Sequence, residues 1–228
     1  MKIAAIYTST TPELVESVNT ELHTRFTGQD IEILSYQNPQ ILATAREYGH
    51  VTPWCAAALV DLYEQARRDG ADILFNLCSS VGDVAKLCKP LYEIMGLAFI
   101  RVDEAMARDT VHRYERIGII ATLPTTMAPT KRLIEQCALE EGRKITVCEA
   151  LADGAFGLNQ QQFKEKLIET GAGVKDRVQA LVFAQGSMAY AKADVSAALN
   201  LPVFASVPYG AAAVYEAACA MEGKRNDS

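Results

Sequence analysis

Residues 72–80 read DILFNLCSS, an apolar run that ends in an amide, a thiol and two hydroxyls. Three further stretches have the same form: IAAIYT at 3–8, IGIIAT at 117–122 and ALVFAQGS at 180–187. Short apolar runs that alternate with longer stretches of helical periodicity are typical of parallel βαβ units. The sequence therefore predicts an α/β protein with buried parallel strands.

The predicted strands include residues 2–7, 116–121 and 202–207. A long loop that contains Pro39, Gly49, His50 and Pro53 is predicted between the second strand and the next helix.

The four stretches also match one another in pairs. Residues 3–8 overlay residues 117–122, and residues 72–78 overlay residues 180–186 at nearly the same offset along the chain. The similar offsets predict two similar Rossmann- or flavodoxin-like parallel-sheet domains with pseudo-twofold symmetry and an interdomain cleft. The alternative is that no duplication occurred, since all buried parallel strands resemble one another as Val, Ile and Leu runs.

The composition is that of a globular protein with an acidic balance. The chain of 228 residues is 50% hydrophobic and 22% charged, and its formal net charge is −6. Nucleic-acid binding needs a cationic surface, and no basic run exceeds two residues before the tail. We therefore exclude nucleic acid as a partner.

The sequence gives no indication of secretion or membrane insertion. The apolar stretch after Lys2 is too short for a secretory core, and the uncharged run 195–215 is interrupted by Pro202, Pro208 and Gly210, which argues against a membrane helix. The six cysteines form no CxxC pair and are typical of reduced thiols. We expect a cytoplasmic protein with no membrane partner.

Polar side chains follow the predicted strands at four places. In open parallel sheets, ligands lie beyond the carboxyl ends of the strands. Hydroxyls and exposed N–H groups at helix starts bind carboxylates or phosphates without a cation, although ordinary N-capping uses the same residues. The candidate binding residues are Thr8, Ser9, Thr10, Asn76, Ser79, Ser80, Thr122, Thr125, Thr126, Gln185, Gly186 and Ser187.

Cys78 is the strongest candidate for chemistry. It follows a predicted strand and precedes a predicted helix with Ser80 as N-cap and Asp83 in the capping-box position. A helix N-terminus favours a thiolate, so we expect a lowered pKa that suits an acid or base near neutral pH. The alternative is a small buried hydrophobe at a strand end.

Motifs for cofactors are absent from the sequence. It contains no GxxxxGK[ST] phosphate loop, no GxGxxG after the first strand, no GxSxG elbow and no HExxH. No residues have metal-ligand spacing. We therefore expect no nucleotide cofactor and no metal.

These segments resemble those of the aspartate/glutamate/hydantoin racemase superfamily over nearly the whole chain. The motifs that carry the resemblance are NLCSS at 76–80, ATLPTT at 121–126, VFAQGSM at 182–188 and PVF at 202–204. The resemblance implies cofactor-independent proton transfer, by two opposed cysteines, at a carbon next to a carboxylate. It also implies Cys78 as the first-domain cysteine, Asn76, Ser79 and Ser80 as its carboxylate-binding neighbours, and Thr122, Thr125 and Thr126 as the second-domain binding turn.

The sequence departs from the family pattern where the second cysteine is expected. Matching on Met188 puts Gln185 there, whereas the internal overlay puts Gly186 opposite Cys78. Neither side chain exchanges a proton near neutral pH. The candidates for a second base are His50, Asp103, Glu104 and Tyr209.

The predicted function is a cofactor-independent racemase or isomerase acting on a small carboxylate-bearing molecule, such as an amino acid or a hydantoin. The alternatives are a single-cysteine decarboxylase or other lyase, a cis-trans isomerase, and a non-catalytic carboxylate-binding protein. From the family architecture we expect a first domain of residues 1–101 plus 208–228 and a second of residues 102–207. The oligomeric state is open, with a homodimer or a higher homo-oligomer as candidates.

Overall fold

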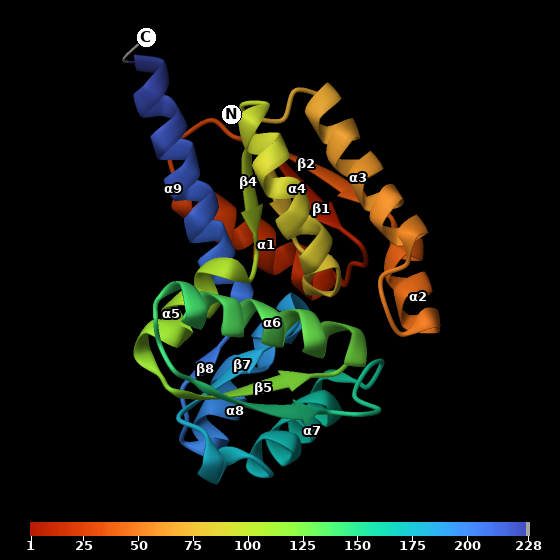
Figure 1. Ribbon diagram of the computed structural model, residues 1–228, viewed down its shortest axis with the longest axis vertical. Coiled ribbons are helices and arrows are strands. Elements are labelled where there is room, and N and C mark those ends of the chain that lie inside the picture. The colour runs from red at the N-terminus through yellow and green to blue at the C-terminus, as the bar shows by residue number, and fades with distance from the viewer. Residues whose placement is uncertain (227–228) are drawn as a thin grey trace. The chain divides into compact units, whose positions relative to one another are not determined.

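The computed structural model describes residues 1–226, with side chains up to residue 223. The chain divides into two compact units. Unit 1 comprises Met1–Val102 together with the chain from Val207 onward, and unit 2 comprises Asp103–Ser206. Each unit is built on its own parallel sheet (Figure 1).

The sheet of unit 1 has the strand order β2-β1-β3-β4, and all neighbours are parallel. The strands are β1 (Lys2–Tyr7), β2 (Glu32–Gln37), β3 (Ile73–Asn76) and β4 (Ala98–Arg101). The helices are α1 (Pro12–Arg25), α2 (Pro39–Tyr48), α3 (Pro53–Arg68), α4 (Gly82–Ile94) and α9 (Ser206–Asn226), and the 3₁₀ turn η1 (Ser79–Val81) precedes α4.

Successive residues of β1 point to opposite faces of this sheet and divide the core in two. Ile3 and Ala5 pack with apolar residues of α1 and α9. Ala4 and Ile6 pack with apolar residues of α2, α3 and α4. Both faces are therefore covered, which is why the strand is a continuous apolar run.

The sheet of unit 2 repeats this topology with the order β6-β5-β7-β8. Its strands are β5 (Arg116–Ala121), β6 (Thr146–Leu151), β7 (Ala180–Phe183) and β8 (Val203–Phe204). Its helices are α5 (Glu104–Arg113), α6 (Pro124–Glu140), α7 (Gln160–Ala172) and α8 (Lys192–Leu199), with the 3₁₀ turns η2 (Lys175–Arg177) and η3 (Gly186–Ala191). The predicted α/β fold built on two parallel sheets is confirmed.

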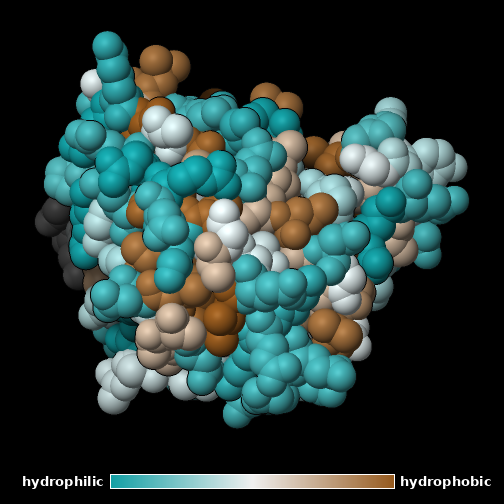
Figure 2. Space-filling model, turned by 90° about the horizontal axis from the view of Figure 1, so that it is seen from below, coloured by the Kyte–Doolittle hydropathy of each residue, from teal (hydrophilic) through white to brown (hydrophobic). Residues whose placement is uncertain are grey.

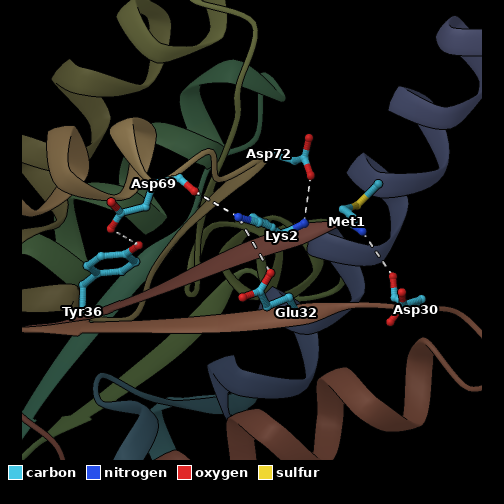
Figure 3. Close-up of polar contacts among 7 residues, drawn as sticks. All are labelled: Met1, Lys2, Asp30, Glu32, Tyr36, Asp69 and Asp72. Carbon is cyan, nitrogen blue, oxygen red and sulfur yellow. Dashed lines mark hydrogen bonds and ion pairs between the residues drawn. The ribbon is translucent and has the colours of Figure 1, made fainter.

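Polar contacts hold the strands together at the amino end of the sheet in unit 1 (Figure 3). The backbone N–H of Lys2 donates to Asp72 Oδ2 at 2.8 Å, and the Lys2 ammonium donates to the Asp69 carbonyl at 3.2 Å. The same ammonium lies 3.9 Å from Glu32 Oε2. These contacts connect β1 to β2 and to the start of β3.

Two segments differ from the sequence prediction. Residues 39–48, expected as part of a long loop, form α2, because Asn38 caps its first turn and Gly49 ends it in the left-handed conformation at φ 72°. The last strand is shorter than predicted, since β8 ends at Phe204 and Val207 already belongs to α9.

Several large apolar side chains of the described residues are exposed, four of them in or next to α4. On the face in Figure 2, hydrophilic residues surround smaller groups of hydrophobic ones. Among the described residues, the most exposed large apolar side chains are Leu87 and Ile94 of α4 and Leu139 of α6. Within residues 1–226, no helix has the length and apolar character needed to cross a bilayer.

Candidate active site

Cys78 lies on the turn that connects β3 to α4. The Leu77 N–H donates to the carbonyl of Ile6, which continues the β1–β3 ladder by one residue, and Cys78 then occupies the N-cap position of η1. Its side chain is half-buried. Thr8, the first residue after β1, is 1% exposed and its hydroxyl donates to Cys78 Sγ at 2.7 Å. The structure thus brings two predicted site residues into direct contact.

Burial raises the pKa of the Cys78 thiol above its ordinary value. The Thr8 hydroxyl lowers that pKa, as do the backbone N–H groups of Val81 and Ser80, but together they do not cancel the effect of burial. The predicted lowering is therefore wrong in its net direction, because desolvation of the charged form outweighs the donors. A thiol that is protonated near neutral pH has a proton to donate.

The prediction that Ser80 caps the helix is also wrong. Ser79, Ser80 and Val81 form the separate turn η1, and α4 begins at Gly82 without a side-chain cap. The short turn directs the N–H groups of Ser80 and Val81 toward the sulfur. Both serines of the turn are buried, with Ser79 6% and Ser80 2% exposed.

Asn76 holds the backbone of the Cys78 turn. Its amide donates to the Cys78 carbonyl at 3.1 Å, and its Oδ1 accepts a hydrogen bond of 2.9 Å from the hydroxyl of Tyr63. Tyr63 comes from α3 and is fully buried. Nothing in the sequence distinguishes Tyr63, because a tyrosine on the apolar stripe of a helix is typical of an ordinary core residue.

Unit 2 contains a corresponding pair after β5 and β7. The N–H and the hydroxyl of Thr122 lie 2.7 Å and 3.0 Å from Gln185 Oε1, and Gln185 Nε2 lies 2.7 Å from the Thr122 hydroxyl. Thr122 is the first residue after β5, as Thr8 is after β1. Gln185 occupies the N-cap position of η3, as Cys78 occupies that of η1.

The strand register decides between the two alignments of the second-cysteine position. Leu77 N–H bonds to the carbonyl of Ile6, and Ala184 N–H bonds to the carbonyl of Ile120 at the same point of its ladder. The next residue along the chain is Cys78 in unit 1 and Gln185 in unit 2. Gln185, and not Gly186, is therefore the structural counterpart of Cys78.

The other predicted binding residues occupy the same turns. The Thr126 hydroxyl donates to the Leu123 carbonyl at 2.8 Å, whereas the buried Thr125 hydroxyl has no hydrogen-bond partner among the described residues. Thr10 is exposed and its hydroxyl donates to Gln37. The half-buried residues are Ser9, Gly186 and Ser187.

The four candidates for a second base come from three places along the chain. His50 is exposed in the α2–α3 connection, where its Nδ1 lies 2.9 Å from the Tyr48 carbonyl. Asp103 is 2% exposed just before α5, and Glu104 pairs with Arg108 at 3.1 Å. Tyr209 is half-buried in the first turns of α9. In the part of the chain that the structure describes, no cluster of His, Cys, Asp and Glu is placed to hold a metal ion.

A buried cation near the Cys78 turn was missed by the sequence analysis. Arg101 ends β4 opposite Asn76 and is 3% exposed. In unit 2 the β7–β8 ladder ends at Val182 and Phe204, and the residues that follow are apolar. An arginine at a strand end is usually exposed to solvent, so the burial of Arg101 is not predictable from the sequence.

These features define an α/β protein of two parallel-sheet units with a hydroxyl-bonded thiol at a strand-end turn of unit 1. The family model described as Asp/Glu/Hydantoin racemase matches residues 3–214. The chain therefore belongs to the Asp/Glu/Hydantoin racemase family and is an isomerase of the racemase type.

Solved structures of racemases share this fold. An allantoin racemase from Klebsiella pneumoniae is 19% identical, with a TM-score of 0.63 and coverage of 97% of this chain and 89% of that one. An aspartate racemase from Picrophilus torridus is 14% identical, with a TM-score of 0.69 and coverage of 96% and 94%. A glutamate racemase from Bacillus anthracis is 12% identical, with a TM-score of 0.68 and coverage of 97% and 82%. No curated protein sequence matches the chain.

Proposed function

We propose that this protein is a cofactor-independent racemase or isomerase that acts at the carbon next to the carboxylate of a small acid, with Cys78 as the acid/base. The observation that carries the proposal is the 2.7 Å contact between the Thr8 hydroxyl and Cys78 Sγ. A hydroxyl and two backbone N–H groups are directed at the sulfur. Such donors stabilise the thiolate that acid/base chemistry requires.

The proposed chemistry needs only proton transfers. A base removes the proton on the carbon next to the carboxylate, and the electron pair left behind is delocalised into that carboxylate. The Cys78 thiol then gives its proton to the carbon, and its thiolate is stabilised by Thr8 and by the N–H groups of Ser80 and Val81. In the reverse direction, the thiolate is the base.

The substrate carboxylate is proposed to bind at the hydroxyl-rich turns. Beside Cys78 in unit 1, the turn after β3 carries the hydroxyls of Ser79 and Ser80, and hydroxyls and N–H groups at such turns bind carboxylates by hydrogen bonds alone. The similar structures are named for allantoin, glutamate and aspartate. Amino acids, hydantoins and related small acids are accordingly the substrates to test.

One observation favours a second candidate function. Gln185 occupies the position equivalent to Cys78, and an amide exchanges no proton near neutral pH. A reaction that needs a single thiol is compatible with this arrangement. The candidates are protonation of a carbanion after decarboxylation or another lyase step, and cis-trans isomerisation after addition of the thiolate to an activated double bond.

The two candidates differ in their products. The test is to incubate amino acids, hydroxy acids, hydantoins, malonates and maleate in deuterated water with wild-type protein or Cys78→Ser, and to follow them by NMR and chiral chromatography. Deuterium at the carbon next to the carboxylate with loss of chirality supports the racemase. Retained configuration, or a released fragment, supports the single-thiol reaction. Binding without turnover of any compound contradicts both candidates and leaves a carboxylate-binding protein.

The cysteines are consistent with work in a reducing compartment. All six are free thiols, and Cys78 performs the proposed chemistry only in its reduced form. We therefore place the proposed activity in the cytoplasm. Mass spectrometry of the protein isolated and unfolded in the presence of an alkylating agent tests this, because every cysteine, including the buried Cys55 and Cys137, is then expected to carry the label.

A further inference from the structure

Arg101 is a buried cation close to the turn that carries Cys78. It is 3% exposed at the carboxyl end of β4, where it pairs in register with Asn76. Asn76 in turn donates to the Cys78 carbonyl. A buried guanidinium is costly unless it is engaged by other groups, and Arg101 has interactions of its own.

The guanidinium lies directly against the start of α4. A Cβ added to Gly82 would be 2.3 Å from Arg101 Nη2 and 2.9 Å from its Cζ. Gly82 is the first residue of α4, and its N–H donates to the Ser79 carbonyl and so closes η1. The glycine at this position therefore leaves the space that the guanidinium fills.

Tyr63 places the arginine and the thiol in one neighbourhood. Burial raises the pKa of Tyr63 well above its ordinary value, and the thiols of Cys88 and Cys78 raise it further. The positive charge of Arg101 opposes this rise. The other titratable groups of α4 are Asp83, Lys86, Lys89, Tyr92 and Glu93, and Asp103 follows β4. Asp83, Lys86, Lys89 and Asp103 all have interaction partners.

We propose that Arg101 is a positioning residue for Cys78: its guanidinium fixes the start of α4, and with it the Ser80 and Val81 N–H groups that face the sulfur. The effect of Arg101 on catalysis rests on the proposed role of Cys78. The effect of Arg101 on the reactivity of the Cys78 thiol is independent of that role, because thiol reactivity is measurable without any substrate.

The experiment is alkylation of the protein by iodoacetamide from about pH 6 to about pH 10, with each cysteine followed in its own peptide by mass spectrometry. The variants are Arg101→Met, Arg101→Lys and Gly82→Ala. Cys88 is the internal reference, because it lies on α4, the helix that follows the Cys78 turn, is half-buried like Cys78 and has a pKa that burial raises.

Arg101→Met is expected to move the pH dependence of Cys78 alkylation upward by about one unit, which is about tenfold slower alkylation at a fixed lower pH. Gly82→Ala should act in the same direction, because its methyl group displaces the guanidinium. Arg101→Lys keeps the charge and should restore part of the rate. The pH dependence of Cys88 alkylation should be unchanged in all three variants.

Two results would overturn the proposal. One is a Cys78 profile that is unchanged in folded Arg101→Met, with the fold checked by circular dichroism. The other is an equal change at Cys78 and Cys88, which would indicate general loosening of the unit. If Arg101→Met does not fold, Gly82→Ala is the deciding variant, because it keeps the arginine. A shift in the pH dependence of alkylation at Cys78 alone then supports the proposal. An unchanged pH dependence at Cys78 refutes it.

Discussion

Two buried tyrosines of unit 1 differ in one respect that allows a quantitative prediction. Tyr63 is 0% exposed and Tyr7 is 2% exposed. The Tyr63 hydroxyl donates to Asn76 Oδ1 at 2.9 Å, whereas the Tyr7 hydroxyl has no hydrogen-bond partner among the described residues. The substitutions Tyr63→Phe and Tyr7→Phe remove the same atom from similarly buried rings.

The expected costs follow from what each hydroxyl leaves behind. Tyr63→Phe deprives the buried Asn76 carbonyl oxygen of its donor, which costs about 1–3 kcal/mol of unfolding free energy. Tyr7→Phe leaves no partner unsatisfied, so its effect should be within about 0.5 kcal/mol of zero or slightly stabilising. For a chain of this size, each kcal/mol corresponds to about 2–4 °C in Tm.

The assay is urea unfolding at neutral pH, followed by circular dichroism for the wild type and both variants. Both variants have to show the same slope of unfolding free energy against urea concentration as the wild type, so that their midpoints can be compared. If Tyr63→Phe is as stable as Tyr7→Phe, the bond to Asn76 does not stabilise the Cys78 turn, and the structural account of that turn is wrong.

Three further predictions concern the same unit. Thr8→Val removes a donor to the sulfur, so Cys78 alkylation at neutral pH should slow about threefold to tenfold, as measured by peptide mass spectrometry. Gly210→Ala puts a Cβ 2.9 Å from the Val102 backbone and should lower stability by about 1–3 kcal/mol in urea unfolding. Burial raises the pKa of Tyr7 to about 12. The part of the unfolding free energy that depends on protonated Tyr7 is therefore fully present below about pH 10 and is lost as the pH rises toward about 12. Tyr7→Phe should accordingly show the smaller alkaline loss of stability in urea unfolding at each pH.

The sequence predicted the fold where a local pattern is unambiguous. The bounds of β1 and β5 were predicted correctly to the residue, because both are apolar runs that end in a polar turn. The helix α2 was missed, although Asn38, Pro39 and Gly49 are its start and stop signals. Those residues are equally common in loops, and local pattern alone does not separate the two uses.

The candidate site was predictable in its residue types but not in its energetics. Cys78 and Thr8 were both expected at strand ends, yet the direction of the thiol pKa depends on burial, which a sequence does not give. The counterpart of Cys78 stayed open until the backbone hydrogen bonds identified Gln185. Arg101 was overlooked because its burial depends on the glycine at position 82, on another element.

The most direct test of the account compares thiol variants on the small acid that the panel identifies. Deuterium incorporation at the carbon next to the carboxylate is measured for wild type, Cys78→Ser and the matched control Cys88→Ser. We predict that Cys78→Ser loses about a hundredfold or more of the rate, while Cys88→Ser retains it. Full activity of Cys78→Ser, or an equal loss in both variants, would contradict the assignment of the chemistry to Cys78.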